Sequence, residues 1–508
     1  MVLASLILGA TVANLNLAAA NVALPSIGRE LGASQTALNL VAVGFTLGLA
    51  ASVLYLGALA DRYGRRLMLI LGLAFCIPAS ALAAWAPSIE VLVLARLLGG
   101  IAAGMAFPTT LSLISALFRG KRQVLAIALW SGLGAGASSL GPVVVGALIS
   151  SFWWGSAFVI TIPLAAVALA CALLFVPRHA GESTEPVDNA GGVLSVALVG
   201  CLIMGINLAP IPSARTATYI LTAVTILALV GFIVRQRRAP NPLFDLQIAK
   251  RPVFWVAALA GVIAFGSLMG SLFIGQQFLQ DVLGYPALHA GLAVLPLSAT
   301  MMLVSPLSAR LIGSHGTRAT LTLGFVIIAA GFVVMVATWR PGASYPVVGA
   351  AYALVGVGVG IAGAPASRSI MSAVPVRRAG MGSATGDLQR DLGGAIMQSI
   401  LGALLSIRYA RFFTDAFAHL PADQQQNLSQ QTAAMIKSSF GGAAKVAELY
   451  PGKADVIMQA AKQAFTSGSR LAISTALIAT LIGLILVVVF FPRKERELQL
   501  ETQYGLEN

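Results

Sequence analysis

Charged residues are scarce in this sequence: they make up 10% of its 508 residues, whereas hydrophobic residues make up 58%. A water-soluble fold of this composition would expose large apolar patches and aggregate. Apolar runs of roughly 20 residues recur along the chain and are long enough to cross a bilayer as helices. They lack the alternation of apolar and polar residues that barrel strands need. The composition therefore predicts an all-α polytopic membrane protein.

Cysteine and histidine are also rare. The three cysteines (Cys76, Cys171 and Cys201) lie inside apolar runs, and there are four scattered histidines. This excludes a disulfide framework and the usual metal-ligand spacings. No HExxH, GxSxG or GxxxxGK[ST] pattern is present either. We therefore expect no metal site and no catalytic residues, which argues against a membrane-embedded enzyme and a nucleotide-driven pump.

Fourteen apolar spans are expected. They cover residues 2–23, 36–59, 67–86, 90–117, 124–149, 156–176, 191–208, 218–234, 253–280, 289–311, 319–338, 346–374, 380–407 and 469–491. The first span follows Met1 with no basic region and no cleavage site, so we expect it to be retained rather than removed as a signal peptide. An even number of spans places both termini on one side of the membrane.

Lysine and arginine are distributed unevenly among the short loops. Nineteen lie in one alternating set of loops and the C-terminal tail, against three in the other set. The positive-inside rule places the first set and both termini in the cytoplasm. The net charge of +14 is thereby explained as an orientation signal. We expect the partner of this basic chain to be the lipid bilayer and not nucleic acid.

An internal repeat divides the chain. The segment FPTTLSLISALFRGKR (107–122) returns weakly as APASRSIMSAVPVRRA (364–379). Two six-helix bundles, 1–176 and 253–508, with two linker helices in 177–252, explain this spacing. Repeats with a site at their interface are usual in secondary transporters. The long segment at about 408–468, before the last span, is expected to form a small, partly helical extracellular cap.

Residues 57–66, GALADRYGRR, gather charge between the second and third spans. The charged members are Asp61, Arg62, Arg65 and Arg66. Gly57 and Gly64 are expected to let backbones approach closely. Asp61 either is solvated, pairs with Arg65, or faces a helix N-terminus or arginine of the other half and latches the cytoplasmic side.

This segment resembles motif A of the major facilitator superfamily. The resemblance implies that Asp61, with Arg62 and Arg65, is a conformational latch that holds the outward-open state. Residues 131–150, SGLGAGASSLGPVVVGALIS, resemble motif C of the antiporters in that superfamily, although Val145 replaces a usual glycine. The motif C candidates are Gly132, Gly136, Gly141, Pro142 and Gly146. A generic packing face of small residues is the alternative.

Four charged residues within spans are candidates for proton coupling. Arg96 lies where the superfamily's motif B places an arginine linked to that coupling, and a structural partner for carbonyl groups is the alternative. Asp387 and Asp391 share a helix face beside Arg390. They form either a protonation switch or a closed salt-bridge network that only pins helices.

Polar and large side chains in three spans are candidates to line a substrate cavity, with helix packing as the alternative. They are Asn14, Asn16, Asn21, Met105, Phe107, Gln276 and Gln277. In many relatives an aspartate occupies the position of Asn16. Asparagine neither carries a proton nor cancels the charge of a cation, which weighs against dicationic drugs.

The span count, the segments NVALPSIG (21–28) and GSATGDLQRDLGGA (382–395), and the long outer segment together resemble the fourteen-span drug:proton antiporters of the EmrB/QacA type. The resemblance implies the major facilitator fold in the plasma (inner) membrane of a prokaryote. It implies a proton-coupled exporter of amphiphilic small molecules, driven by the proton gradient without a cofactor, and we expect a monomer. The alternatives are an exporter or flippase of lipids or an endogenous metabolite and, less favoured, a transport-dead sensor.

Overall fold

The computed structural model describes residues 1–118, 126, 129–130, 140–177, 186–374, 379–419 and 429–506, and their regular structure is entirely helical. The helices of the first part are α1 (Val2–Leu31), α2 (Gln35–Tyr63), α3 (Arg65–Ala84), α4 (Ile89–Leu117), the helix Leu140–Ser151, α6 (Ser156–Val159), α7 (Thr161–Phe175), α8 (Asn189–Leu208), η1 (Pro212–Ala214) and α9 (Arg215–Arg238). Those of the second part are α10 (Leu246–Ala249), α11 (Pro252–Gln277), η2 (Phe278–Val282), α12 (Ala287–Ala293), α13 (Leu295–His315), α14 (Thr317–Thr338), α15 (Tyr345–Ser372), α16 (Ala379–Ala418), α18 (Gln430–Ser438), α19 (Phe440–Leu449), η4 (Pro451–Lys453), α20 (Ala454–Phe490) and α21 (Lys494–Leu506).

Thirteen of the described helical segments are long and apolar enough to cross a membrane. The expectation of an all-α polytopic membrane protein is therefore confirmed. The fifth expected span, 124–149, lies largely outside the described residues, which hold only its second part in the helix Leu140–Ser151. The count of fourteen stays a prediction.

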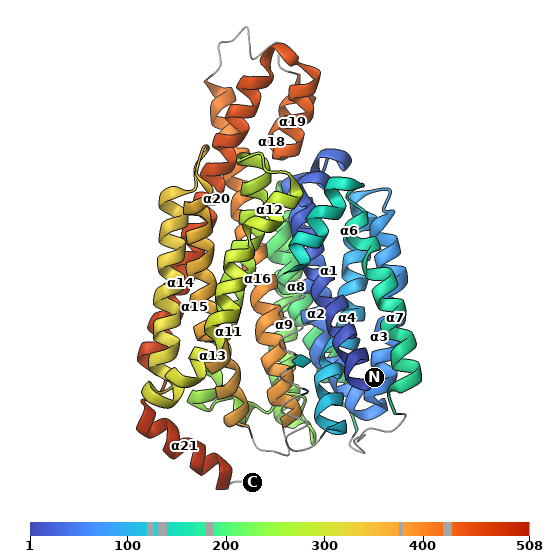
Figure 1. The fold of residues 1–508 in the computed structure, drawn as a ribbon, viewed down its shortest axis with the longest axis vertical. Coiled ribbons are helices and arrows are strands. Elements are labelled where there is room, and N and C mark those ends of the chain that lie inside the picture. Colours follow the sequence, from blue (N-terminus) through green and yellow to red (C-terminus); the bar gives the residue numbers. More distant parts are fainter. Residues whose placement is uncertain are drawn as a thin grey trace.

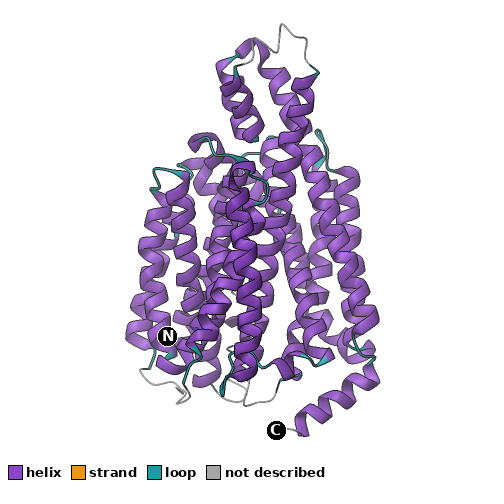
Figure 2. Cartoon of the chain, turned by 180° about the vertical axis from the view of Figure 1, so that it is seen from behind, coloured by secondary structure: helices purple, strands orange, loops and turns teal. Residues whose placement is uncertain are grey.

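The helices form one bundle in which the two parts of the chain lie side by side (Figure 1). Helices α1–α4, α6 and α7 occupy one side, and α11, α13–α15 and α20 occupy the other. Both chain termini lie at the same end of the bundle, and α18 and α19 project from the opposite end, as the view from behind also shows (Figure 2). This arrangement agrees with two halves, whose boundaries at 176 and 253 stay predictions.

The segment expected as a partly helical cap is indeed mostly helical where it is described. Helix α16 runs 40 residues and α20 runs 37, so both continue beyond the apolar spans and project from the bundle with α18 and α19. We call these projecting parts the cap. The buried rings of Phe440 and Phe465, 6.4 Å apart, continue the apolar core of the bundle into the cap.

The cap also contacts the connection between α1 and α2, in the other half of the chain. Ser439 Oγ donates to the backbone oxygen of Ala33 at 2.8 Å. Lys445 Nζ donates to the backbone oxygen of Glu30 at 3.2 Å. The cap therefore ties the second half of the chain to the first at this end of the bundle.

Helix α8 contacts both α2 and α16, while α9 packs on α8. Asn207, near the end of α8, donates its Nδ2 to Ser399 Oγ of α16 at 2.7 Å. At the start of α8, Tyr55 Oη of α2 donates to Asn189 Oδ1 at 3.0 Å. The first linker helix is thus attached to one half at each of its ends.

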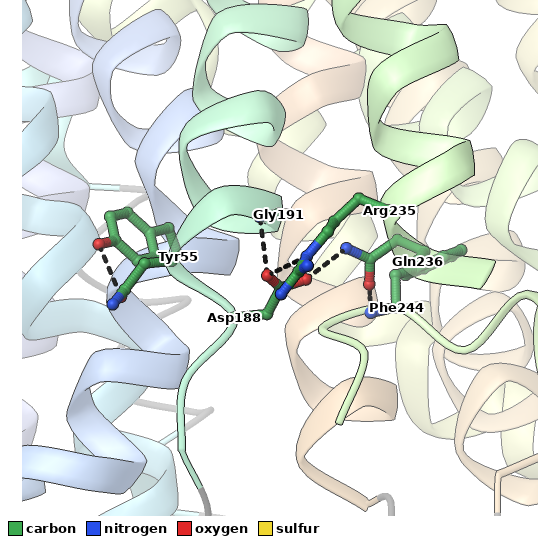
Figure 3. Close-up of polar contacts among 7 residues, drawn as sticks. Tyr55, Asp188, Gly191, Arg235, Gln236 and Phe244 are labelled. Carbon is green, nitrogen blue, oxygen red and sulfur yellow. Dashed lines mark hydrogen bonds and ion pairs between the residues drawn. The ribbon is translucent and has the colours of Figure 1, made fainter. Parts of the chain in front are cut away.

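The buried carboxylate of Asp188 organises the start of α8 (Figure 3). It caps the helix by accepting from the backbone N–H of Gly191 at 3.1 Å. It also accepts from Arg235 Nε at 2.8 Å and from Gln236 Nε2 at 3.1 Å, both at the end of α9. Gln236 Oε1 in turn accepts from the backbone N–H of Phe244 at 3.0 Å. One carboxylate therefore joins α8, α9 and the segment that leads into the second half.

Replacing Asp188 is expected to loosen both linker helices. Asp188→Ala leaves Arg235, Gln236 and the α8 N-terminus without their acceptor, which should cost roughly 1–3 kcal/mol. We expect a lower thermal unfolding midpoint in detergent than for Asp415→Ala, a matched loss of an exposed acid. Equal midpoints for the two variants would contradict the organising role of Asp188.

Candidate functional site

A cavity of about 280 Å³ lies in the middle of the bundle, between the two halves. Its walls come from α1, α4, the helix Leu140–Ser151, α11, α13 and α16, together with Trp130. Most of the lining is apolar or aromatic. Its polar and charged members among the described residues are Asn14, Asn21, Gln276, Ser298 and Arg390. The cavity therefore suits a mainly apolar molecule that carries few polar groups.

Four of the seven expected cavity residues line this cavity, namely Asn14, Asn21, Phe107 and Gln276. The acceptor Oδ1 of Asn21 is buried without a hydrogen-bond partner, so it is open to a donor from a bound molecule. Gln276 Nε2 donates to the backbone oxygen of Ala290 at 3.0 Å, which fixes this side chain.

The other three expected cavity residues do not line it among the described residues. Asn16 Nδ2 donates to the backbone oxygen of Val12 at 3.3 Å and lies 3.7 Å from Cys76 Sγ of α3. Met105 is half-buried on α4 but is absent from the cavity wall. Gln277 Oε1 accepts from Gln35 Nε2 of α2 at 2.7 Å. Asn16, expected as a cavity residue, thus faces α3 instead.

Arg96 is almost fully buried inside α4 at 1% exposure. Its Nη1 donates to the backbone oxygen of Asn16 at 2.9 Å, and its Nε donates to that of Val41 at 3.4 Å. The rings of Phe45 and Phe158 lie 4.8 and 5.4 Å from its guanidinium carbon. These contacts join α4 to α1 and α2, and they match the carbonyl-partner alternative for this arginine.

The acidic pair of α16 lies beside the cavity. Asp387 and Asp391 are each 7% exposed, and Asp391 Oδ2 is buried without a hydrogen-bond partner. Arg390 lines the cavity, with its guanidinium carbon 5.4 Å from the centre of the Phe265 ring of α11. Within the described part of the chain, no ion pair joins Arg390 to either acid. Among the described residues, the closed salt-bridge network considered from the sequence is therefore not formed.

The GALADRYGRR segment forms the turn between α2 and α3, where Gly64 has a positive φ of 112°. Asp61 Oδ1 accepts from Arg65 Nε and Nη2, both at 3.0 Å, which is one of the pairings expected from the sequence. Arg65 also reaches the backbone of α4, and Arg66 reaches that of α7. The expected close approach at Gly57 is wrong for the described residues, since no atom lies within 4 Å of where its Cβ would stand.

The described part of the SGLGAGASSLGPVVVGALIS segment packs against the second half. A Cβ on Gly146 would lie 2.5 Å from the backbone oxygen of Ala287, and a Cβ on Gly291 would lie 2.4 Å from that of Pro142. A Cβ on Gly141 would lie 2.9 Å from Ala18 Cβ. Gly132 and Gly136 lie outside the described residues. The contacts at Gly146 and Gly291 bring the halves together backbone to backbone on the cap side of the cavity, whereas Gly141 packs on α1 of its own half.

Glutamine side chains add polar contacts between the halves at the same level. Gln35 of α2 donates to Gln277 of α11, and Gln280 Nε2 donates to the backbone oxygen of Val22 at 2.9 Å. Gln35 was not predictable from the sequence, because it lies at the very start of an apolar span. Phe265, which contacts Arg390, was not predictable either, because an aromatic residue in an apolar run carries no distinguishing signal.

Comparison with known proteins gives consistent matches. The model of the Major Facilitator Superfamily matches residues 6–398. The multidrug efflux pump LfrA of Mycolicibacterium smegmatis is 32% identical over 468 residues, which are 92% of this chain and 90% of that protein. The methyl viologen resistance protein SmvA of Salmonella typhimurium is 28% identical over 463 residues, covering 90% of this chain and 91% of that protein.

The fold has solved counterparts. The crystal structure of a bacterial homologue of the human lysosomal transporter Spinster, inward-facing and unoccupied, matches with a TM-score of 0.66 at 16% identity. The match covers 96% of this chain and 97% of that chain. At this identity the likeness concerns the fold, which is the one expected from the sequence.

A substitution of Arg96 separates its two interpretations. Arg96→Lys keeps the positive charge but loses the planar fork that reaches two backbone oxygens. If the contacts are structural, the variant loses roughly 1–3 kcal/mol and melts at a lower temperature in detergent than Arg368→Lys, a matched change at an exposed arginine. An unchanged melting temperature with loss of proton movement would instead assign Arg96 to coupling.

Proposed function

This chain belongs to the Major Facilitator Superfamily, and from that premise we propose that it is a proton-coupled exporter of amphiphilic small molecules. The family and the drug-efflux names of its relatives favour a transporter over an enzyme. The expected number of spans favours the fourteen-span drug:proton antiporter branch. The lysine and arginine distribution favours a cytoplasmic position for both termini in the plasma membrane of a prokaryote.

The observation that carries the proposal is the apolar cavity between the two halves. Its lining contains aromatic and aliphatic side chains with a few amides and one cation. Backbone contacts close the cap side of this cavity, as described for Gly146 and Gly291. Alternating access would release those contacts and open the cavity toward the cap, with the Asp61 segment latching the opposite end.

Proton coupling is assigned in this proposal to Asp387 and Asp391. Both are buried next to the cavity-lining Arg390, and neither forms an ion pair among the described residues. Burying an ionised carboxylate without a partner is costly. Exposure of the pair to water in one state and burial in the other therefore favours different protonation states, which is what antiport requires.

The charge of the cavity favours neutral or anionic amphiphiles over dications. No carboxylate is among its described lining residues, and 131–139 of the neighbouring span contains no ionisable side chain. A dication would meet Arg390 in the cavity wall, where no carboxylate among the described residues offsets its charge. The same features support the second candidate, an exporter or flippase of a lipid or an endogenous metabolite.

Antiport is tested in liposomes that contain a pH-sensitive dye. Addition of neutral, anionic or dicationic amphiphiles to the wild type should move protons when a substrate is transported. Asp387→Asn/Asp391→Asn should reduce this movement to the level of empty liposomes, whereas Asp415→Asn, at an exposed acid of the same helix, should retain it. Substrate movement by the wild type without proton movement would contradict antiport and leave a facilitator or flippase.

The charge preference is tested at Arg390. Arg390→Gln removes the one cation among the described lining residues, so transport of anionic relative to neutral amphiphiles should fall roughly tenfold. The ratio of anionic to neutral amphiphile transport separates a change of selectivity from a general loss of activity. Arg368→Gln, at an exposed arginine of α15, is the matched control. An unchanged ratio, or a wild type that prefers dications, would contradict the assignment.

A further inference from the structure

A second, separate cleft of about 590 Å³ lies at the end of the bundle that carries both chain termini. It is formed by the start of α14, the end of α20 and the start of α21. Its rim carries the cations Arg318, Arg493 and Lys494 together with His315. No carboxylate is among its described lining residues, so the cleft concentrates positive charge.

The cations are held in place by the neighbouring helices. Lys494 Nζ donates to the backbone oxygens of Gly313 and Ser314 at 2.8 and 3.0 Å, at the end of α13. Arg318 donates from Nη2 to the backbone oxygen of Val488. The side chain of Arg493 is exposed. The remaining guanidinium N–H groups of these two arginines have no hydrogen-bond partner among the described residues and point to an anion as ligand.

A nearby acid is already engaged. Glu497 Oε2, on α21, accepts from the backbone N–H of Thr317 at 3.4 Å, at the start of α14. Glu497 is buried and does not line the cleft. Together with Lys494 it fixes α21 against the turn between α13 and α14. The geometry of the cationic rim is therefore set by helix contacts and does not depend on a bound molecule.

The other wall of the cleft is apolar and faces outward. Leu323, Val326 and Val488 line it and are 42%, 48% and 39% exposed. All three belong to membrane-spanning helices, so their exposed surface faces lipid tails. A cationic rim next to an apolar wall matches a molecule with a phosphate at one end and hydrocarbon chains at the other.

We propose that this cleft binds an anionic phospholipid. Its phosphate accepts hydrogen bonds from Arg318 and Arg493 beside Lys494, and an acyl chain lies along Leu323, Val326 and Val488. A free phosphate ion would use the rim but leave the apolar wall unused. The lipid would also hold α21 against the bundle, since Arg493 and Lys494 lie at the start of that helix.

The proposal is tested by native mass spectrometry of the delipidated full-length protein. It is incubated with phosphatidylglycerol, with phosphatidylcholine of the same chain length, or with inorganic phosphate. We expect selective retention of phosphatidylglycerol. Retention should weaken roughly fivefold for each cation removed and about a hundredfold in Arg318→Gln/Arg493→Gln/Lys494→Gln.

Two further variants keep the result interpretable. Arg493→Gln removes a cation that makes no side-chain hydrogen bond to a described residue, so it tests the site without loosening α21. Arg237→Gln/Arg238→Gln/Arg310→Gln removes three exposed cations outside the cleft and should leave retention unchanged. Equal retention of both lipids, competition by inorganic phosphate at matched concentration, or undiminished retention in the cleft variants would each overturn the proposal.

Discussion

The rest of the structure depends on the backbone-to-backbone contact between the two halves on the cap side. At Gly146 and Gly291 the main chain of one half lies where a Cβ of the other would stand. Small residues make such contact between helices possible in a membrane, where no hydrophobic effect drives helices together. Because main chain closes this side of the cavity, opening it requires whole helices to move as rigid bodies, which side-chain rotation alone would not achieve.

Much of the fold was predictable because its signals are long and repeated. Apolar runs of span length, and a segment that resembles a motif of the matched family, are each read directly from the chain. The breaks within the spans were not predictable from the sequence. The π-helical turn at η2 and the interruption at Val294 depend on how α11, α12 and α13 pack, and no residue pattern at either place specifies it alone.

The candidate cavity was predicted in part, for a geometric reason. Successive residues of a helix are about 100° apart, so Asn14 and Asn16 point to directions about 200° apart. Asn14 lines the cavity while Asn16 turns toward α3. The same rotation separates Phe107 from Met105. A polar residue in an apolar span signals a buried contact, but the partner is fixed only when the neighbouring helices are placed.

Two arginines in apolar spans show the same limit of prediction from the sequence. The guanidinium of Arg96 is held by two backbone oxygens between aromatic rings, whereas that of Arg390 lines the cavity over Phe265. From the sequence each is simply a costly charge in the membrane. Their different surroundings separate an arginine that joins helices from one that is available to a ligand.

Helix α8 affects how a molecule dissolved in the bilayer could reach the cavity. It covers the line along which α2 meets α16, and α9 covers α8 in turn. A molecule dissolved in the bilayer on that face is therefore separated from the cavity by two layers of helix. A neighbouring protein that packs on α9 in the membrane would therefore leave the route of a bilayer-dissolved molecule to the cavity unchanged.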